Sequence, residues 1–133
     1  PFKTSAFAID MEDASVDSIF CMRLMHHIAD HNHRLAILNE FHRVTRDTVV
    51  LSLWVDGNFK AWRRKRLEEK RAALKGKAAN QNRFVVTRQQ IEAEFREANF
   101  RVVNYRDFMP GYAMWRMYTL RKGHNNEKPF NNP

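Results

Sequence analysis

Cysteine is nearly absent from this 133-residue sequence, in which Cys21 stands alone. A single cysteine excludes intrachain disulfides and a cysteine-rich zinc site, and it fits a reducing compartment. Long apolar runs are also absent: the longest, at 48–55 and 19–22, fall far short of the roughly 20 residues that cross a bilayer. The first residues lack the basic, apolar and small-residue succession of an export signal. We therefore expect a cytoplasmic protein without a transmembrane helix.

Acidic residues are scarce where basic residues gather. The segment 60–77 contains nine Lys or Arg residues and two Glu residues, a local net charge of +7 within a chain total of +8. The rest of the chain is therefore close to neutral, and the basic character belongs to one segment. Apolar residues make up 44% and charged residues 29%, which is the balance of a single globular domain with a core.

The first half of the chain alternates between strand and helix patterns. Apolar and β-branched runs predict strands at 18–22 and 47–54, the second covered on both faces because its polar residues hardly alternate. Between them, apolar residues at helical spacing predict a helix at about 31–45. The basic segment 59–77 has strong helix formers and a sparse apolar stripe, so we expect an exposed helix there.

The second half adds one helix and a hairpin. Thr87-Arg-Gln-Gln90 matches a capping box and predicts a helix that ends near Asn99. Strands are predicted at 100–106 and 114–121, and the short turn between them requires an antiparallel hairpin. The polar tail 123–133 is expected to be disordered. The order as a whole predicts an α/β fold with a largely parallel sheet.

Three local motifs add a family resemblance. The first motif is similar to a D-x-S-F-D turn and the strand after it, and consists of Asp13-Ala-Ser-Val-Asp17 followed by Ser18-Ile-Phe-Cys-Met22. The second resembles a hydrophobic-hydrophobic-His-His signature, at Met22-Arg-Leu-Met-His-His-Ile28. The third resembles a helix end of the form hydrophobic-x-R-V-L-K/R, at Phe41-His-Arg-Val-Thr-Arg46. In this order, over residues 4–122, the chain resembles the C-terminal part of class I S-adenosylmethionine-dependent methyltransferases, in their small-molecule branch. The resemblance implies a partial, Rossmann-like domain at 1–122 with a basic helical insertion at about 57–83. It also implies transfer of a methyl group from S-adenosylmethionine to a small-molecule acceptor.

The departures from the family concern its cofactor. Such enzymes hold S-adenosylmethionine on a G-x-G-x-G turn, and the four glycines of this chain (Gly57, Gly76, Gly111, Gly123) form no such turn. An acidic residue for the ribose hydroxyls is missing too. The chain begins at Pro1 without an initiator methionine. We therefore expect a fragment of a longer methyltransferase that alone binds the cofactor poorly or not at all.

The resemblance assigns two groups of residues to the cofactor side. Met22 and Arg23 follow the strand at 18–22, where open α/β sheets place their ligand crevice. Ser5 and Ala6 align with the Asp-Ala pair that meets the adenine in many members, so Ser5 offers a hydroxyl but no carboxylate. His26 and His27 are candidates for a catalytic role, and the alternative is that one of them caps or packs the next helix. The spacing of these histidines with His31 and His33 matches no recognised metal-ligand set, so no metal site is expected.

The basic helix and the hairpin turn supply candidates for the substrate side. Because Trp62 interleaves with Arg63 and Arg64, we expect a cap over an acceptor pocket, with Tyr112 lining it from the turn. The plain alternative is a helix whose charges only face water. A second hypothesis is a non-enzymatic module that binds nucleic acid or an anionic membrane through the same helix. We also expect exposed sheet edges to favour a homodimer.

Overall fold

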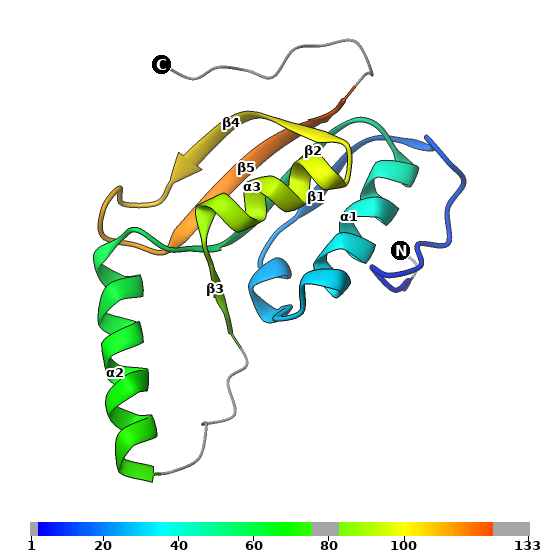
Figure 1. The fold of residues 1–133 in the computed structure, drawn as a ribbon. Helices are drawn as coiled ribbons and strands as arrows, with labels where there is room; N and C mark the ends of the chain where they lie inside the picture. Colours follow the sequence, from blue (N-terminus) through cyan, green and yellow to red (C-terminus); the bar gives the residue numbers. More distant parts are fainter. Residues whose placement is uncertain (1–2, 76–82, 124–133) are drawn as a thin grey trace.

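A computed structural model describes residues 3–75 and 83–123 of the chain. Within these residues the chain forms five strands, three α-helices and one short 3-10 helix (Figure 1). In chain order they are β1 (Val16–Cys21), η1 (Met25–His27), α1 (His31–Val44), β2 (Thr45–Val55), α2 (Phe59–Lys75), β3 (Val85–Val86), α3 (Arg88–Glu97), β4 (Phe100–Asp107) and β5 (Trp115–Lys122). The predicted tail and part of the predicted insertion, 76–82, lie outside the described residues.

The five strands form one sheet in the order β1-β2-β5-β4, and β3 pairs with the end of β2. β1 and β3 run parallel to β2, whereas β5 runs antiparallel to both β2 and β4. Four strands therefore point the same way, and β5 alone is reversed. This confirms the predicted fold, a mostly parallel sheet that ends in an antiparallel hairpin. The two-residue β3 and the 3-10 helix η1 were not predicted, because such short segments show no hydrophobic period.

β2 is central because its sequence is apolar on both faces. Val49, Leu51 and Leu53 are fully buried on one face, and Trp54 is buried on the other. The strand ends at Val55, and Gly57 in the following turn has a φ of +78°, which is accessible to glycine without strain. α2 then leaves the sheet and projects away from it (Figure 1).

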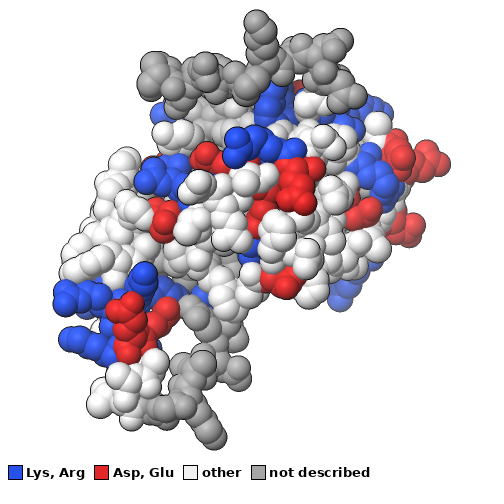
Figure 2. Space-filling model, viewed as in Figure 1, with Lys and Arg blue, Asp and Glu red and all other residues white. Residues whose placement is uncertain are grey.

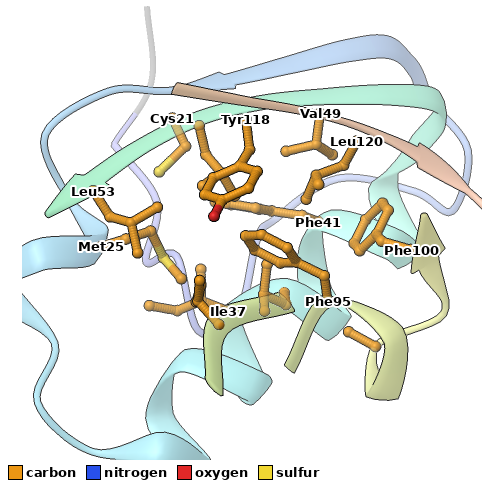
Figure 3. Close-up of a cluster of buried hydrophobic side chains, with 14 of the residues drawn as sticks. Cys21, Met25, Ile37, Phe41, Val49, Leu53, Phe95, Phe100, Tyr118 and Leu120 are labelled. Carbon is orange, nitrogen blue, oxygen red and sulfur yellow. The ribbon is translucent and has the colours of Figure 1, made fainter. Parts of the chain in front are cut away.

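α1 and α3 pack side by side on one face of the sheet and close the core. Both first turns are capped: the Asp30 carboxylate accepts from the His33 backbone N–H, and the Thr87 hydroxyl, as predicted, accepts from that of Gln90. Both helices send apolar side chains against the strands (Figure 3). The core includes Cys21, Met25, Ile37, Phe41, Val49, Leu53, Phe95, Phe100, Tyr118 and Leu120.

The second face of the sheet is open at the β1 end. Phe20 on β1 pairs in register with Val50 on β2, and both point away from the α1–α3 side. The Phe20 side chain is 73% exposed, and Met117 on the same face of β5 is 40% exposed. Among the described elements, no helix covers these residues.

A buried ion pair joins the two helices. The guanidinium of Arg34 on α1 donates to both carboxylate oxygens of Glu94 on α3, at 2.8 and 2.6 Å. Its third nitrogen donates to the carbonyl oxygens of Ile28 and Ala29, at 2.9 and 2.7 Å. Burial alone would raise the pKa of Glu94, but the hydrogen bonds from Arg34 and His31 outweigh it and lower that pKa. The pair therefore holds α3, α1 and the loop after η1 in one arrangement.

Candidate functional site

The carboxyl ends of β1 and β2 meet at one edge of the sheet, where the chain gathers its polar and aromatic residues. Met22 and Arg23 follow β1 directly, and both are exposed. Arg23 has a φ of +61°, and its backbone N–H donates to the Ser52 hydroxyl at 3.0 Å. This left-handed residue turns the chain away from the strand and into η1, so its side chain projects from the edge of the sheet.

His26 is buried in an aromatic cluster at this edge. Its ring stacks on Trp54, with centroids 4.9 Å apart, and meets Trp115 edge-on at 4.9 Å. The neighbouring His27 is exposed, with its ring centroid 4.1 Å from that of His26. The two candidate histidines therefore differ in access: His26 is 2% exposed and packs as a core residue does, whereas His27 faces solvent.

The cluster contains two buried polar atoms without a partner among the described residues. These are Nδ1 of His26 and Nε1 of Trp54. Burial, reinforced by the positive charges of His27, Arg83 and Arg23, lowers the pKa of His26 to about 4. His26 is therefore a neutral imidazole at neutral pH, and one of its nitrogens is available as a hydrogen-bonding group.

Two arginines cover the exposed side of the cluster. The guanidinium groups of Arg64 and Arg83 lie 5.1 and 5.7 Å from the Trp54 ring centroid. Arg64 also donates to the Arg83 carbonyl oxygen at 2.9 Å, and the Phe84 N–H donates to the His26 carbonyl oxygen at 2.7 Å. These contacts connect α2, the residues before β3 and η1 around one tryptophan.

A groove of about 740 Å³ opens beside this cluster. Its walls are α2, the turn after β2 and the residues around β3. Apolar surface predominates in it, but four of the residues that line it are charged: Asp56, Arg64, Lys65 and Glu68. The lining includes Asp56, Phe59, Ala61, Trp62, Arg64, Phe84 and Val85. Apolar walls with a few polar groups are typical of sites for small organic ligands.

Of the four residues expected on the substrate side, some line the groove and others do not. Trp62 and Arg64 line the groove. The Tyr112 ring stacks on Phe59, with centroids 5.9 Å apart and planes 12° apart, so it joins the groove through that side chain. Arg63 lies on the exposed side of α2, turned away from the groove by the 100° step of the helix.

Ser5 and Ala6 lie apart from this edge cluster, in the N-terminal loop. The Ser5 hydroxyl accepts from the Phe7 N–H at 3.2 Å, and Ala6 packs against the core. Phe7 contacts the ring of His33 in the first turn of α1, at 5.6 Å. The loop therefore flanks the start of α1, and the Ser5 hydroxyl makes a hydrogen bond within its own turn.

Trp54, Arg83 and Phe84 were not singled out from the sequence. In the sequence, Trp54 is one more apolar residue of a predicted buried strand. It differs from the others only in being the next-to-last residue of β2, at the carboxyl edge of the sheet. Arg83 and Phe84 lie before a strand too short to predict. His31 bonds to Glu94 at 2.8 Å, and the described residues contain no His, Cys, Asp and Glu group able to hold a metal ion.

Known proteins resemble this chain in fold but hardly in sequence. No protein-family model and no curated protein matches the sequence. Solved structures do match. A methyltransferase from Methanosarcina mazei that depends on S-adenosylmethionine has a TM-score of 0.69 and 13% identity over 90% of this chain and 65% of its own. Magnesium protoporphyrin IX methyltransferase from Synechocystis, with bound S-adenosylhomocysteine, has a TM-score of 0.65 and 10% identity over 90% of this chain and 49% of its own. The [4+2]-cyclase SpnF has a TM-score of 0.60 and 12% identity over 90% of this chain and 54% of its own.

These similarities show that the chain has the class I methyltransferase fold. The chain spans between about half and two thirds of the length of the three structures, at 49% to 65%. At 10% to 13% identity the likeness concerns the fold, and one of the three is a cyclase.

Proposed function

We propose that this chain is the acceptor-binding part of a longer methyltransferase that transfers a methyl group from S-adenosylmethionine to a small molecule. One observation carries the proposal: a groove with apolar walls meets an aromatic cluster at the carboxyl edge of a sheet with the methyltransferase fold. That edge is where open α/β sheets bind their ligands.

The residues of this chain do not fit the whole cofactor. Of the described glycines, Gly57 and Gly111 have positive φ, but neither belongs to a glycine-rich turn. A Cβ added at Gly57 would lie 2.6 Å from the Arg88 guanidinium, so a side chain of the protein occupies that approach. Met22 and Arg23 offer at most one wall, Ser5 and Ala6 lie apart from them, and we propose that residues outside this chain supply the rest.

On the acceptor side, the groove suits a flat or apolar molecule with an anionic group. Phe59, Trp62 and Phe84 offer apolar and aromatic surface, and the lining also contains Lys65 and an Arg64 that is paired with Glu68. We propose that His27, the exposed member of the pair, contacts the acceptor, and that neutral His26 orients Trp54 by stacking. Holding the acceptor in line and excluding water are the main tasks of the protein in such transfers.

The test is isothermal titration of S-adenosylhomocysteine into this chain and, side by side, into a version extended upstream along its gene. We expect binding by the extended version only, and a methyl-transfer assay with that version then identifies the acceptor. The matched variants Arg23→Gln and Arg96→Gln each remove one exposed arginine. Only the first is expected to weaken binding, by about tenfold, as for a lost charge-assisted hydrogen bond. Absence of binding by both versions would contradict the proposal.

A further inference from the structure

α2 packs against the rest of the chain along one side only. Ala61 is buried, and Arg64 and Glu68 are half-buried, at a spacing that places all three on the groove side. Steps of 100° per residue place another set away from Ala61 and Arg64, where every member is exposed and where Phe59 and Trp62 lie at the margin of the groove. This outward side consists of Phe59, Trp62, Arg63, Arg66, Leu67, Lys70 and Leu74. Leu74 is 85% exposed and Trp62 is 54% exposed, so large apolar side chains face solvent there.

The apolar surface continues from α2 onto the turn between β4 and β5. The Phe59 ring lies 5.9 Å from Trp62 on one side and 5.9 Å from Tyr112 on the other. The backbone N–H groups of Phe59 and Lys60 donate to the carbonyl oxygens of Gly111 and Tyr112, at 2.9 and 3.0 Å. In the same turn Phe108 is 66% exposed and Met109 is 53% exposed. We call the outward side of α2, with Lys60 and residues 108–112, the basic aromatic surface.

The charged groups of this surface are basic, and the acidic Glu69 lies at its margin, seven residues after Trp62 on the helix. Arg66 lies 5.0 Å from the Trp62 ring centroid, and the Lys60 ammonium lies 5.1 Å from that of Tyr112. Of the two acidic residues of α2, Glu68 bonds to Arg64 at 2.7 Å, and Glu69 follows one turn after Lys65 on the flank. Figure 2 shows basic side chains at this projecting end of the molecule, with acidic side chains between them. The aliphatic stems thus lie along aromatic rings while the cationic groups surround an apolar patch.

We propose that the basic aromatic surface docks the protein onto an anionic phospholipid bilayer. Exposed Trp, Phe and Leu among Lys and Arg are typical of helices that lie in the headgroup region. A nucleic acid would engage the cations and the rings, but it offers nothing to Leu67, Leu74 and Met109. No described helix is long and apolar enough to cross a membrane. Phe59 and Trp62 also line the groove, so docking places the groove beside the lipid phase.

The test is co-sedimentation of the full chain with vesicles of phosphatidylcholine alone or with roughly one third phosphatidylglycerol. We expect binding to the anionic vesicles only. The double variant Arg63→Gln/Lys70→Gln should lower the partition coefficient about 30-fold, from the usual contribution of a basic residue at such a surface. The matched double variant Lys3→Gln/Arg96→Gln, which removes one lysine and one arginine elsewhere, should leave it unchanged.

Tryptophan fluorescence gives an independent readout. Trp54 is 7% exposed and Trp115 is half-buried against His26 and Trp54, so a blue shift of the emission on adding anionic vesicles should come chiefly from Trp62. Trp62→Phe should retain binding and lose most of the shift, and Trp62→Ala should weaken binding by about tenfold at every salt concentration. The proposal would be overturned if the two double variants had equal effects or if the folded chain did not bind vesicles. It would also be overturned if the chain bound single-stranded RNA but not vesicles.

Discussion

His26 illustrates how a side chain acquires properties that its sequence position does not reveal. Its neighbour His27 has the same chemistry but faces solvent, whereas His26 is enclosed by Trp54 and Trp115. Burial, with nearby positive charge, lowers the pKa of His26 to about 4. The unfolded chain has an ordinary histidine pKa near 6.5, so below that pH the unfolded state binds the proton more readily.

Stability should therefore depend on pH through His26. As pH falls from about 6.5 to about 4, His26 should reduce the free energy of unfolding by roughly 3 kcal/mol at most, since one pKa unit corresponds to about 1.4 kcal/mol. Urea unfolding across this range measures the effect. His26→Phe should remove that part of the pH dependence, and replacing the exposed His33 by Gln should leave it unchanged. An imidazole pKa for His26 near 6.5 by NMR would contradict the expectation.

Among the helices, α1 and α3 are joined by charge as well as by apolar packing. The side chains of Arg34 and Glu94 are 2% and 1% exposed, and each satisfies the other. Removing one partner leaves an uncompensated buried charge, which is far more costly than losing a surface ion pair. The pair also positions the loop after His26 through the Ile28 and Ala29 carbonyls, so the site depends on it.

Arg34→Met should reduce the free energy of unfolding by about 3–5 kcal/mol, because Glu94 then remains buried with His31 and Gln90 but without its guanidinium partner. Arg96→Met, which changes an exposed arginine of α3, should change it by less than about 0.5 kcal/mol. Urea denaturation of the three proteins measures both values. If Arg34→Met/Glu94→Leu restores stability, the loss in Arg34→Met is due to the buried Glu94 carboxylate. Equal stabilities of the two single variants would contradict the prediction.

The molecule as a whole is a sheet covered by α1 and α3 on one face and open beside β1 on the other. β1 pairs only with β2 among the described strands, and Phe20 is exposed next to its free edge. Unpaired edges and exposed apolar patches favour association with another chain. The homodimer expected from the sequence stays a prediction, and this edge is where we place it.

Phe20→Lys should therefore weaken self-association at least tenfold, because the charge would have to be buried against the partner. Light scattering after size-exclusion chromatography, over a range of concentrations, measures the association. Phe108→Lys gives the matched control, since Phe108 is 66% exposed but lies in the turn between β4 and β5. A parent chain that stays monomeric at every concentration would disprove the homodimer.

Hydrophobic periodicity and capping residues sufficed to predict most of the fold. The helix at 31–45 is α1 (His31–Val44), and the Thr87 cap starts α3 as predicted. These features depend on neighbours within a few positions, so local sequence specifies them. The assignments of Met22, Arg23, Ser5 and Ala6 to a cofactor rest on resemblance and stay predictions.

The contacts that form the candidate site could not be predicted from the sequence. Trp54, His26 and Arg64 come from three elements, and they meet because the parallel strands β1 and β2 end at one edge and α2 begins beside it. The exposure of Phe59 and Trp62 likewise depends on which side of α2 faces the groove. Periodicity identifies a helix and its apolar residues. Packing between distant segments decides which side of the helix is covered and which side is exposed.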